Sequence, residues 1–133
     1  MSRSKSDLHN ELVAAYEQAA SIYAQRHPND PQPFLSCTHR TGAEQDGLYA
    51  IGRTTKGKIV TNAKAGQSPH NKYPSAAFDI AFIGLNKKLD WNKKYFRQFS
   101  DIIKEINDRV VCGIDWKSLP DAPHYELKNW KTL

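Results

Sequence analysis

The feature that most constrains the fold of this chain is the apolar run at 76–83, AAFDIAFI, which has the length of a β-strand and contains one acidic residue. An ionised carboxylate in such a strand is costly unless it is paired or binds a cation. Two interpretations of Asp79 therefore remain open. It either faces solvent on an edge strand or pairs with a lysine, or it belongs to a buried charged site.

Two amphipathic helices are predicted, one on each side of this strand in the sequence. Apolar residues recur at helical spacing over 7–27, where Asp7 or Ser6 can cap the start, and again over 91–110. The shorter predicted elements are a helix at 42–52 and strands at 34–38, 58–61, 110–116 and 124–127. Long helices before and after short strands indicate an α+β fold.

The size and composition of the chain predict a single domain over residues 1–133, with residues 1–6 as a disordered lead-in. Five Phe, six Tyr and three Trp can supply a core without metal or disulfide staples. Cys37 and Cys112 are the only cysteines, which excludes a disulfide scaffold and a four-cysteine zinc module; they are either unpaired or joined in one bridge. No apolar run reaches the roughly 20 residues of a membrane helix, and no secretory signal is visible.

The net charge of +5 favours anionic partners, among which are nucleic acids, membrane surfaces and anionic cell-wall polymers. Lysines are mixed with aromatic residues at 87–95. This run is either a nucleic-acid-binding face or the solvated start of a helix, and we favour the helix start.

A candidate metal site combines Asp79 with two histidines from separate segments. His70 lies nine residues earlier in a polar segment, and His124 is flanked by Asp121 and Glu126. Two imidazoles and one carboxylate are the protein ligands of a catalytic zinc site that leaves its fourth position to water. A nearby carboxylate that is not a ligand, Asp121 or Glu126, can then act as general base. Each histidine taken singly is more often an idle surface or core residue, so the alternative without a site stays open.

Other catalytic patterns find little support in the sequence. The chain has no helical His-Glu-x-x-His, no Gly-x-Ser-x-Gly and no glycine-rich phosphate loop. Cys37 and His39 are a weak candidate for a thiol nucleophile and its base.

Taken together, the segments resemble a known family of zinc peptidases. Ser68-Pro69-His70 followed by AFDI at 77–80 is similar to the Ser-x-His…Ala-x-Asp signature of D-alanyl-D-alanine carboxypeptidases, dipeptidases and phage L-alanyl-D-glutamate endopeptidases. Three further segments resemble the family in the same order along the chain: THRTGAEQ at 38–45, VCGIDW at 111–116 and DAPHY at 121–125. The resemblance covers roughly residues 34–127.

The resemblance implies a zinc (Zn2+) site and a catalytic set around it, on a small antiparallel sheet with flanking helices, the hedgehog/DD-peptidase-like fold. The implied zinc ligands are His70, Asp79 and His124, the general base is Asp121, Arg40 polarises the scissile carbonyl or holds the oxyanion, and Ser68 and Gln45 lie near the substrate. One departure is the longer spacing between His70 and Asp79, with Pro74-Ser75 where the family usually has glycine, which we interpret as a longer loop.

The function that the resemblance implies is zinc-dependent hydrolysis of the L-alanyl-D-glutamate bond in the peptidoglycan stem peptide, by a phage or prophage endolysin acting in host lysis. We expect a monomer without a nucleic-acid partner, made in the host cytoplasm without a signal peptide and reaching the cell wall (periplasm) after holin-type release. One alternative is a D-alanyl-D-alanine carboxypeptidase or dipeptidase on the same scaffold. The other is a basic nucleic-acid-binding domain without enzymatic activity, which would bind no stoichiometric zinc.

Overall fold

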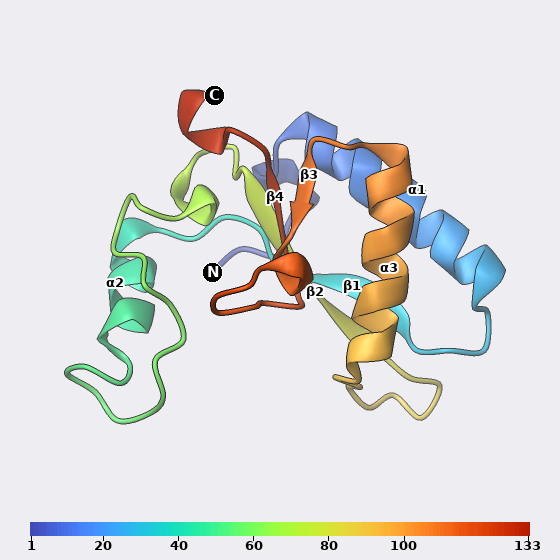
Figure 1. Ribbon diagram of the computed structural model, residues 1–133, viewed down its shortest axis with the longest axis horizontal. Coiled ribbons are helices and arrows are strands. Elements are labelled where there is room, and N and C mark those ends of the chain that lie inside the picture. The colour runs from blue at the N-terminus through green and yellow to red at the C-terminus, as the bar shows by residue number, and fades with distance from the viewer.

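A four-stranded antiparallel sheet organises the chain in the computed structural model, which describes all 133 residues (Figure 1). Across the sheet, the strands are β1 (Gln32–Cys37), β2 (Ala77–Ile83), β4 (His124–Leu127) and β3 (Val110–Cys112). The helices are α1 (Asn10–Arg26), α2 (Gly42–Ala50) and α3 (Lys93–Ile106), with short 3-10 turns η1 (Lys5–Asp7), η2 (Pro69–Asn71), η3 (Gly113–Asp115) and η4 (Trp130–Thr132). The predicted α+β class and antiparallel sheet are confirmed.

Helices α1 and α3 pack against each other and cover one face of this sheet (Figure 1). Phe78, Ile80 and Phe82 alternate along β2 and are all fully buried in this core. Phe78 stacks on Tyr125 of β4, with the ring centroids 5.1 Å apart. Because successive side chains of a strand point to opposite faces, the same alternation directs Asp79 to the face away from the two helices.

Strand β2 lies in the interior of the sheet, between β1 and β4. In the strand register, Asp79 is opposite Cys37 of β1 and His124 of β4. The interpretation of Asp79 as a solvent-facing residue on an edge strand is therefore wrong, and its carboxylate is placed where it needs a partner.

The first helix begins later than the sequence predicts. Neither Ser6 nor Asp7 caps α1; instead, the Nδ1 atom of His9 accepts a hydrogen bond from the main-chain N–H of Glu11. Asp7 accepts side-chain hydrogen bonds from Ser2 and from Tyr73. The capping side chain is thus diverted to a long-range contact that the local sequence does not reveal.

The N-terminal residues 1–6, for which the sequence predicts disorder, lie alongside the segment that follows β1. The main-chain N–H of Ser2 donates to the carbonyl of His39 (2.9 Å), and the N–H of Thr38 donates to the carbonyl of Ser2 (2.7 Å). These residues are therefore held beside the face of the sheet that carries Asp79.

Two predicted strand segments differ in the structure. The predicted strand at 110–116 ends at Cys112 and continues as η3, because Gly113 turns toward the carbonyl of Asp121, where a methyl group would overlap that oxygen. Residues 58–61 form no strand. The guanidinium of Arg53 donates to the carbonyl of Thr61 (3.0 Å) and fixes this segment as a loop instead.

The two cysteines, Cys37 and Cys112, are both buried and free, so no disulfide bridge joins them. The lysine-rich run at 87–95 leads into the first turn of α3, as the helix-start interpretation predicts. No helix of this structure is both long and apolar enough to cross a membrane.

Candidate metal centre

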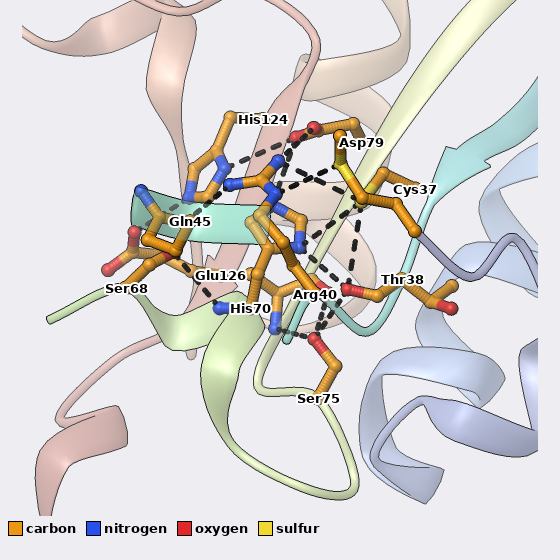
Figure 2. A network of polar contacts seen from close by, with 12 residues as sticks. Cys37, Thr38, Arg40, Gln45, Ser68, His70, Ser75, Asp79, His124 and Glu126 are labelled. Carbon is orange, nitrogen blue, oxygen red and sulfur yellow. Dashed lines mark hydrogen bonds and ion pairs between the residues drawn. The ribbon is translucent and has the colours of Figure 1, made fainter. Parts of the chain in front are cut away.

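The three predicted ligands come from three separate segments of the chain and meet on one face of the sheet (Figure 2). His70 lies on η2, a turn that is fixed because Ser68 Oγ accepts the N–H of His70 and Asn71 Oδ1 accepts the N–H of Ser68. Asp79 is in the middle of β2, and His124 begins β4 directly opposite it. The sheet register and the capped turn together place these side chains.

The donor atoms of the two histidines converge on a single oxygen of Asp79. His70 Nε2 lies 3.3 Å from Asp79 Oδ1, and His124 Nδ1 lies 3.2 Å from the same oxygen. Ligands at 2.0–2.1 Å from a tetrahedral zinc ion are about 3.3 Å apart, since the edge of a tetrahedron is about 1.6 times the bond length. The two separations match the edges of a zinc-sized tetrahedron.

Each imidazole is also held through its outer nitrogen. His70 Nδ1 donates to the main-chain carbonyl of Thr38 (2.7 Å), and His124 Nε2 donates to the Glu126 carboxylate (2.8 Å). Both partners are acceptors, so each outer nitrogen carries its proton and the inner lone pair of a neutral ring points toward Asp79. Two lone pairs facing one carboxylate require a proton or a cation between them. The donor set therefore fits a metal ion, with outer partners of the kind that orient metal-ligating histidines.

In the metal-free protein, protons supply this positive charge. Burial disfavours the charged form of His70, but the Asp79 carboxylate outweighs it and raises the pKa of His70 to about 10. Burial likewise opposes charging His124, while hydrogen bonds to Asp79 and Glu126 raise its pKa. Burial alone would raise the pKa of Asp79, but the two imidazoles hold it well below its ordinary value.

Cys37 adds a sulfur atom to the same neighbourhood. Its Sγ, with the donor atoms of His70 and Asp79, forms a possible metal-binding group whose atoms all lie within 4.8 Å of one another. However, Cys37 Sγ contacts His70 at Nδ1 (3.9 Å), the nitrogen already bonded to Thr38, and not at the nitrogen that faces Asp79. The set of His70, Asp79 and His124 is therefore the better directed of the two, because an inner nitrogen of each imidazole faces Asp79 Oδ1.

Arg40 brings a positive charge to the edge of the cluster. Its Nη2 lies 3.7 Å from Asp79 Oδ2, and its Nη1 donates to Gln45 Oε1 (2.8 Å). Gln45 is fully buried, and its Nε2 donates a second hydrogen bond to the carbonyl of Ala63 (2.8 Å). In this arrangement, Gln45 holds Arg40 and Ser68 caps η2. Contact of either residue with a substrate stays a prediction.

Asp121 lies beside the cluster, one turn of chain before His124, whose N–H donates to the Asp121 carbonyl (3.1 Å). Asp121 is an exposed residue, but partial loss of water around its carboxylate and the negative charge of Asp79 raise its pKa, partly offset by the imidazoles and Arg40. A carboxylate with a raised pKa is a better proton acceptor at neutral pH. This environment is suited to a general base.

Two features of the site are not settled by the sequence alone. Glu126 was one of two candidate bases, but its carboxylate is engaged by His124 Nε2. The sequence could have indicated this contact, because His124 and Glu126 are two residues apart on a strand and therefore share a face. The role of the Thr38 carbonyl carries no sequence signal, because every residue has one.

The alignment with a curated protein supports the resemblance drawn from the motifs. The chain is 36% identical over 95 residues to the peptidoglycan L-alanyl-D-glutamate endopeptidase CwlK of Bacillus subtilis (strain 168). The chain is thus similar in sequence to an L-alanyl-D-glutamate endopeptidase. The alignment covers 66% of this chain and 56% of CwlK, so the chain spans only about half the length of that relative. No family model matches the chain.

Solved structures confirm the fold of the chain. The L-Ala D-Glu endopeptidase ChiX of Serratia marcescens superimposes with a TM-score of 0.65 at 17% identity, covering 98% of this chain and 90% of ChiX. The vancomycin resistance D,D-pentapeptidase VanY, as an E175A mutant in complex with Zn(II), gives a TM-score of 0.63 at 11% identity, covering 93% of this chain and 74% of VanY. The zinc DD-peptidase fold expected from the motifs is thus confirmed.

Proposed function

We propose that this chain is a zinc-dependent peptidoglycan peptidase that hydrolyses the L-alanyl-D-glutamate bond of the stem peptide. The observation that carries the proposal is the convergence of His70 Nε2 and His124 Nδ1 on Asp79 Oδ1, with both outer nitrogens engaged by acceptors. The similarity to CwlK over 95 residues supports the choice of bond.

In this mechanism, His70, Asp79 and His124 would hold the zinc ion. When bound, zinc supplies Lewis-acid chemistry, polarising a carbonyl and lowering the pKa of water from 15.7 to about 7. Asp121 accepts the proton of the attacking water and returns it to the leaving amine, a role for which its raised pKa prepares it.

Arg40 stabilises the negative charge that develops on the carbonyl oxygen. Its guanidinium is positioned by Gln45 and lies against Asp79, so little reorganisation is needed when that charge appears. Glu126 and the Thr38 carbonyl keep the two imidazoles oriented.

The decisive experiment combines zinc analysis with digestion of purified peptidoglycan and mass analysis of the new termini. One equivalent of zinc and new N-terminal D-glutamate support the proposal. Absence of stoichiometric zinc together with salt-dependent binding to nucleic acid supports the non-enzymatic alternative.

A D-alanyl-D-alanine carboxypeptidase or dipeptidase on the same scaffold is the second candidate, favoured by the similarity of the fold to VanY. The same digestion separates the two, because this activity releases D-alanine or the D-alanyl dipeptide and leaves the L-alanyl-D-glutamate bond intact.

We further propose that the enzyme is a monomeric phage or prophage endolysin that reaches the cell wall during host lysis. His70, Asp79 and His124 already meet within a single chain, so the three-ligand site needs no side chain from a second copy. Expression in a bacterial host with and without a co-expressed holin tests the lytic role, since lysis should require both proteins.

A further inference from the structure

The net charge of the chain is concentrated in one segment. Residues 47–78 contain five basic and no acidic residues, whereas the rest of the chain contains 14 of each, so the segment accounts for the whole net charge of +5. Its central part is a loop at 52–66, here called the basic loop, which carries four of the five charges. These are Arg53, Lys56, Lys58 and Lys64.

The charges of the basic loop are exposed and face no carboxylate of the chain. Some basic residues elsewhere in the chain are paired, as where Arg97 and Lys104 both bind Asp115. None of the basic-loop side chains takes part in an ion pair. A cluster of like charges without internal partners attracts anions.

The loop is nevertheless anchored in a defined conformation. The Arg53 guanidinium donates to the carbonyls of Tyr49 (2.6 Å) and Thr61 (3.0 Å) and lies 3.8 Å from the centre of the Tyr49 ring. The main-chain N–H of Ala65 donates to the Asp46 carboxylate of α2 (2.8 Å). Arg53 thus has a structural role. Lys64 Nζ also lies near the Tyr49 ring, 5.3 Å from its centre, but none of the three lysines pairs with a carboxylate, so their charges are left for a ligand.

The basic loop is also connected to the candidate metal centre through two side chains. Gln45 donates to the carbonyl of Ala63 within the loop and accepts from Arg40, which contacts Asp79. Four residues after the loop ends at Gly66, the chain reaches His70. In Figure 1, α2 and this loop form one side of the molecule, on the opposite side from α1 and α3. A polymer bound at the metal centre has the basic loop as its neighbour.

From this arrangement we propose that the basic loop is a second contact surface for the carboxylate-bearing glycan–peptide strand of peptidoglycan, separate from the residues that perform hydrolysis. Lys56, Lys58 and Lys64 pair with the carboxylates of the strand. Ile59 and Val60, which are 48% and 58% exposed between these lysines, pack against its apolar methyl groups. This inference rests on the proposed function for the identity of the polymer.

The test compares two triple variants that remove the same charge from opposite parts of the molecule. The first is Lys56→Gln, Lys58→Gln and Lys64→Gln; the matched control changes the exposed Lys87, Lys88 and Lys93, around the loop between β2 and α3, to Gln. Both are made in the zinc-loaded Asp121→Ala chain, so that binding to purified sacculi can be measured by co-sedimentation without digestion. Circular dichroism and thermal melts check that each variant folds.

We expect the basic-loop variant to bind sacculi on the order of tenfold more weakly at low salt, because each exposed ion pair contributes only a small factor. High salt should remove the difference. With Asp121 intact, the same variant should cleave a short soluble stem peptide as fast as the wild type but digest sacculi more slowly.

Unchanged binding by the basic-loop variant, or an equal loss in the control, would overturn the proposal. The proposal would also be overturned if the chain bound only those sacculi that retain phosphate-rich polymers, or if it bound duplex DNA and not sacculi. Failure of the proposed function gives a different result, since the wild-type chain would then cleave neither substrate whatever its binding to sacculi.

Discussion

Replacement of Glu126 by alanine should weaken zinc binding without unfolding the protein. The Glu126 carboxylate accepts a 2.8 Å hydrogen bond from His124 Nε2, and the two side chains are only 15% and 7% exposed. Loss of such an outer partner typically costs 10- to 100-fold in metal affinity, or roughly 1.4–2.7 kcal/mol. Glu126→Gln retains an acceptor oxygen and should lose about fivefold or less, because only the charge is removed.

The assay is a competition titration of zinc against a chromophoric chelator, at one fixed pH, for the wild-type and variant chains. Glu105→Ala is the matched control, since Glu105 is exposed on α3. The control should bind zinc like the wild type. If Glu126→Ala also binds zinc within twofold of the wild type, the hydrogen bond does not orient a metal ligand and the reasoning is wrong.

Four further predictions concern the general base, the protons of the site and the chain around it. Asp121→Ala should keep one equivalent of zinc by elemental analysis and lose about 10²–10⁴-fold in turnover; full activity would remove the base assignment. Zinc affinity, titrated in buffers from pH 6 to 8, should rise about 10- to 100-fold per pH unit because zinc displaces protons from raised-pKa imidazoles, whereas a flat profile would contradict this. In metal-free chemical denaturation, the contribution of His70 to the free energy of unfolding should be complete below pH 6.5 and lost as the pH rises through about 10, because its pKa is raised on folding. The contribution of Asp79, whose pKa is lowered on folding, should instead be lost as the pH falls below 3.8. Gly113→Ala should lower zinc affinity because its methyl group displaces the Asp121 carbonyl. Gly47→Ala on α2, which has open space around it, should raise the free energy of unfolding by up to about 1 kcal/mol. Equal zinc binding by the two variants would refute the packing argument.

The elements predicted correctly are those whose signal is local. The alternation of Phe78, Ile80 and Phe82 and the period of α3 are set by burial on one face, and burial is what the structure shows. The strand at 58–61 was predicted wrongly because propensity cannot show whether a partner strand exists. The start of α1 was wrong because Asp7 bonds Tyr73, far along the chain.

The composition of the candidate site could be proposed from the sequence, but its geometry could not. Residue types and motif order were enough to select His70, Asp79 and His124 as a group. That Asp79 and His124 are directly opposite each other depends on the register of β2 and β4, which pairs residues 45 positions apart. The division of roles between Asp121 and Glu126 likewise depends on which carboxylate reaches His124 Nε2.

The late position of His124 in the chain has a consequence for when activity can arise. A ribosome-bound chain carries His70 and Asp79 well before β4 has been made, and until β4 pairs with β2 the third side chain is missing. A partly synthesised or truncated product is therefore expected to be inert toward its substrate. The appearance of tight zinc binding during refolding would accordingly report the time at which β4 pairs with β2.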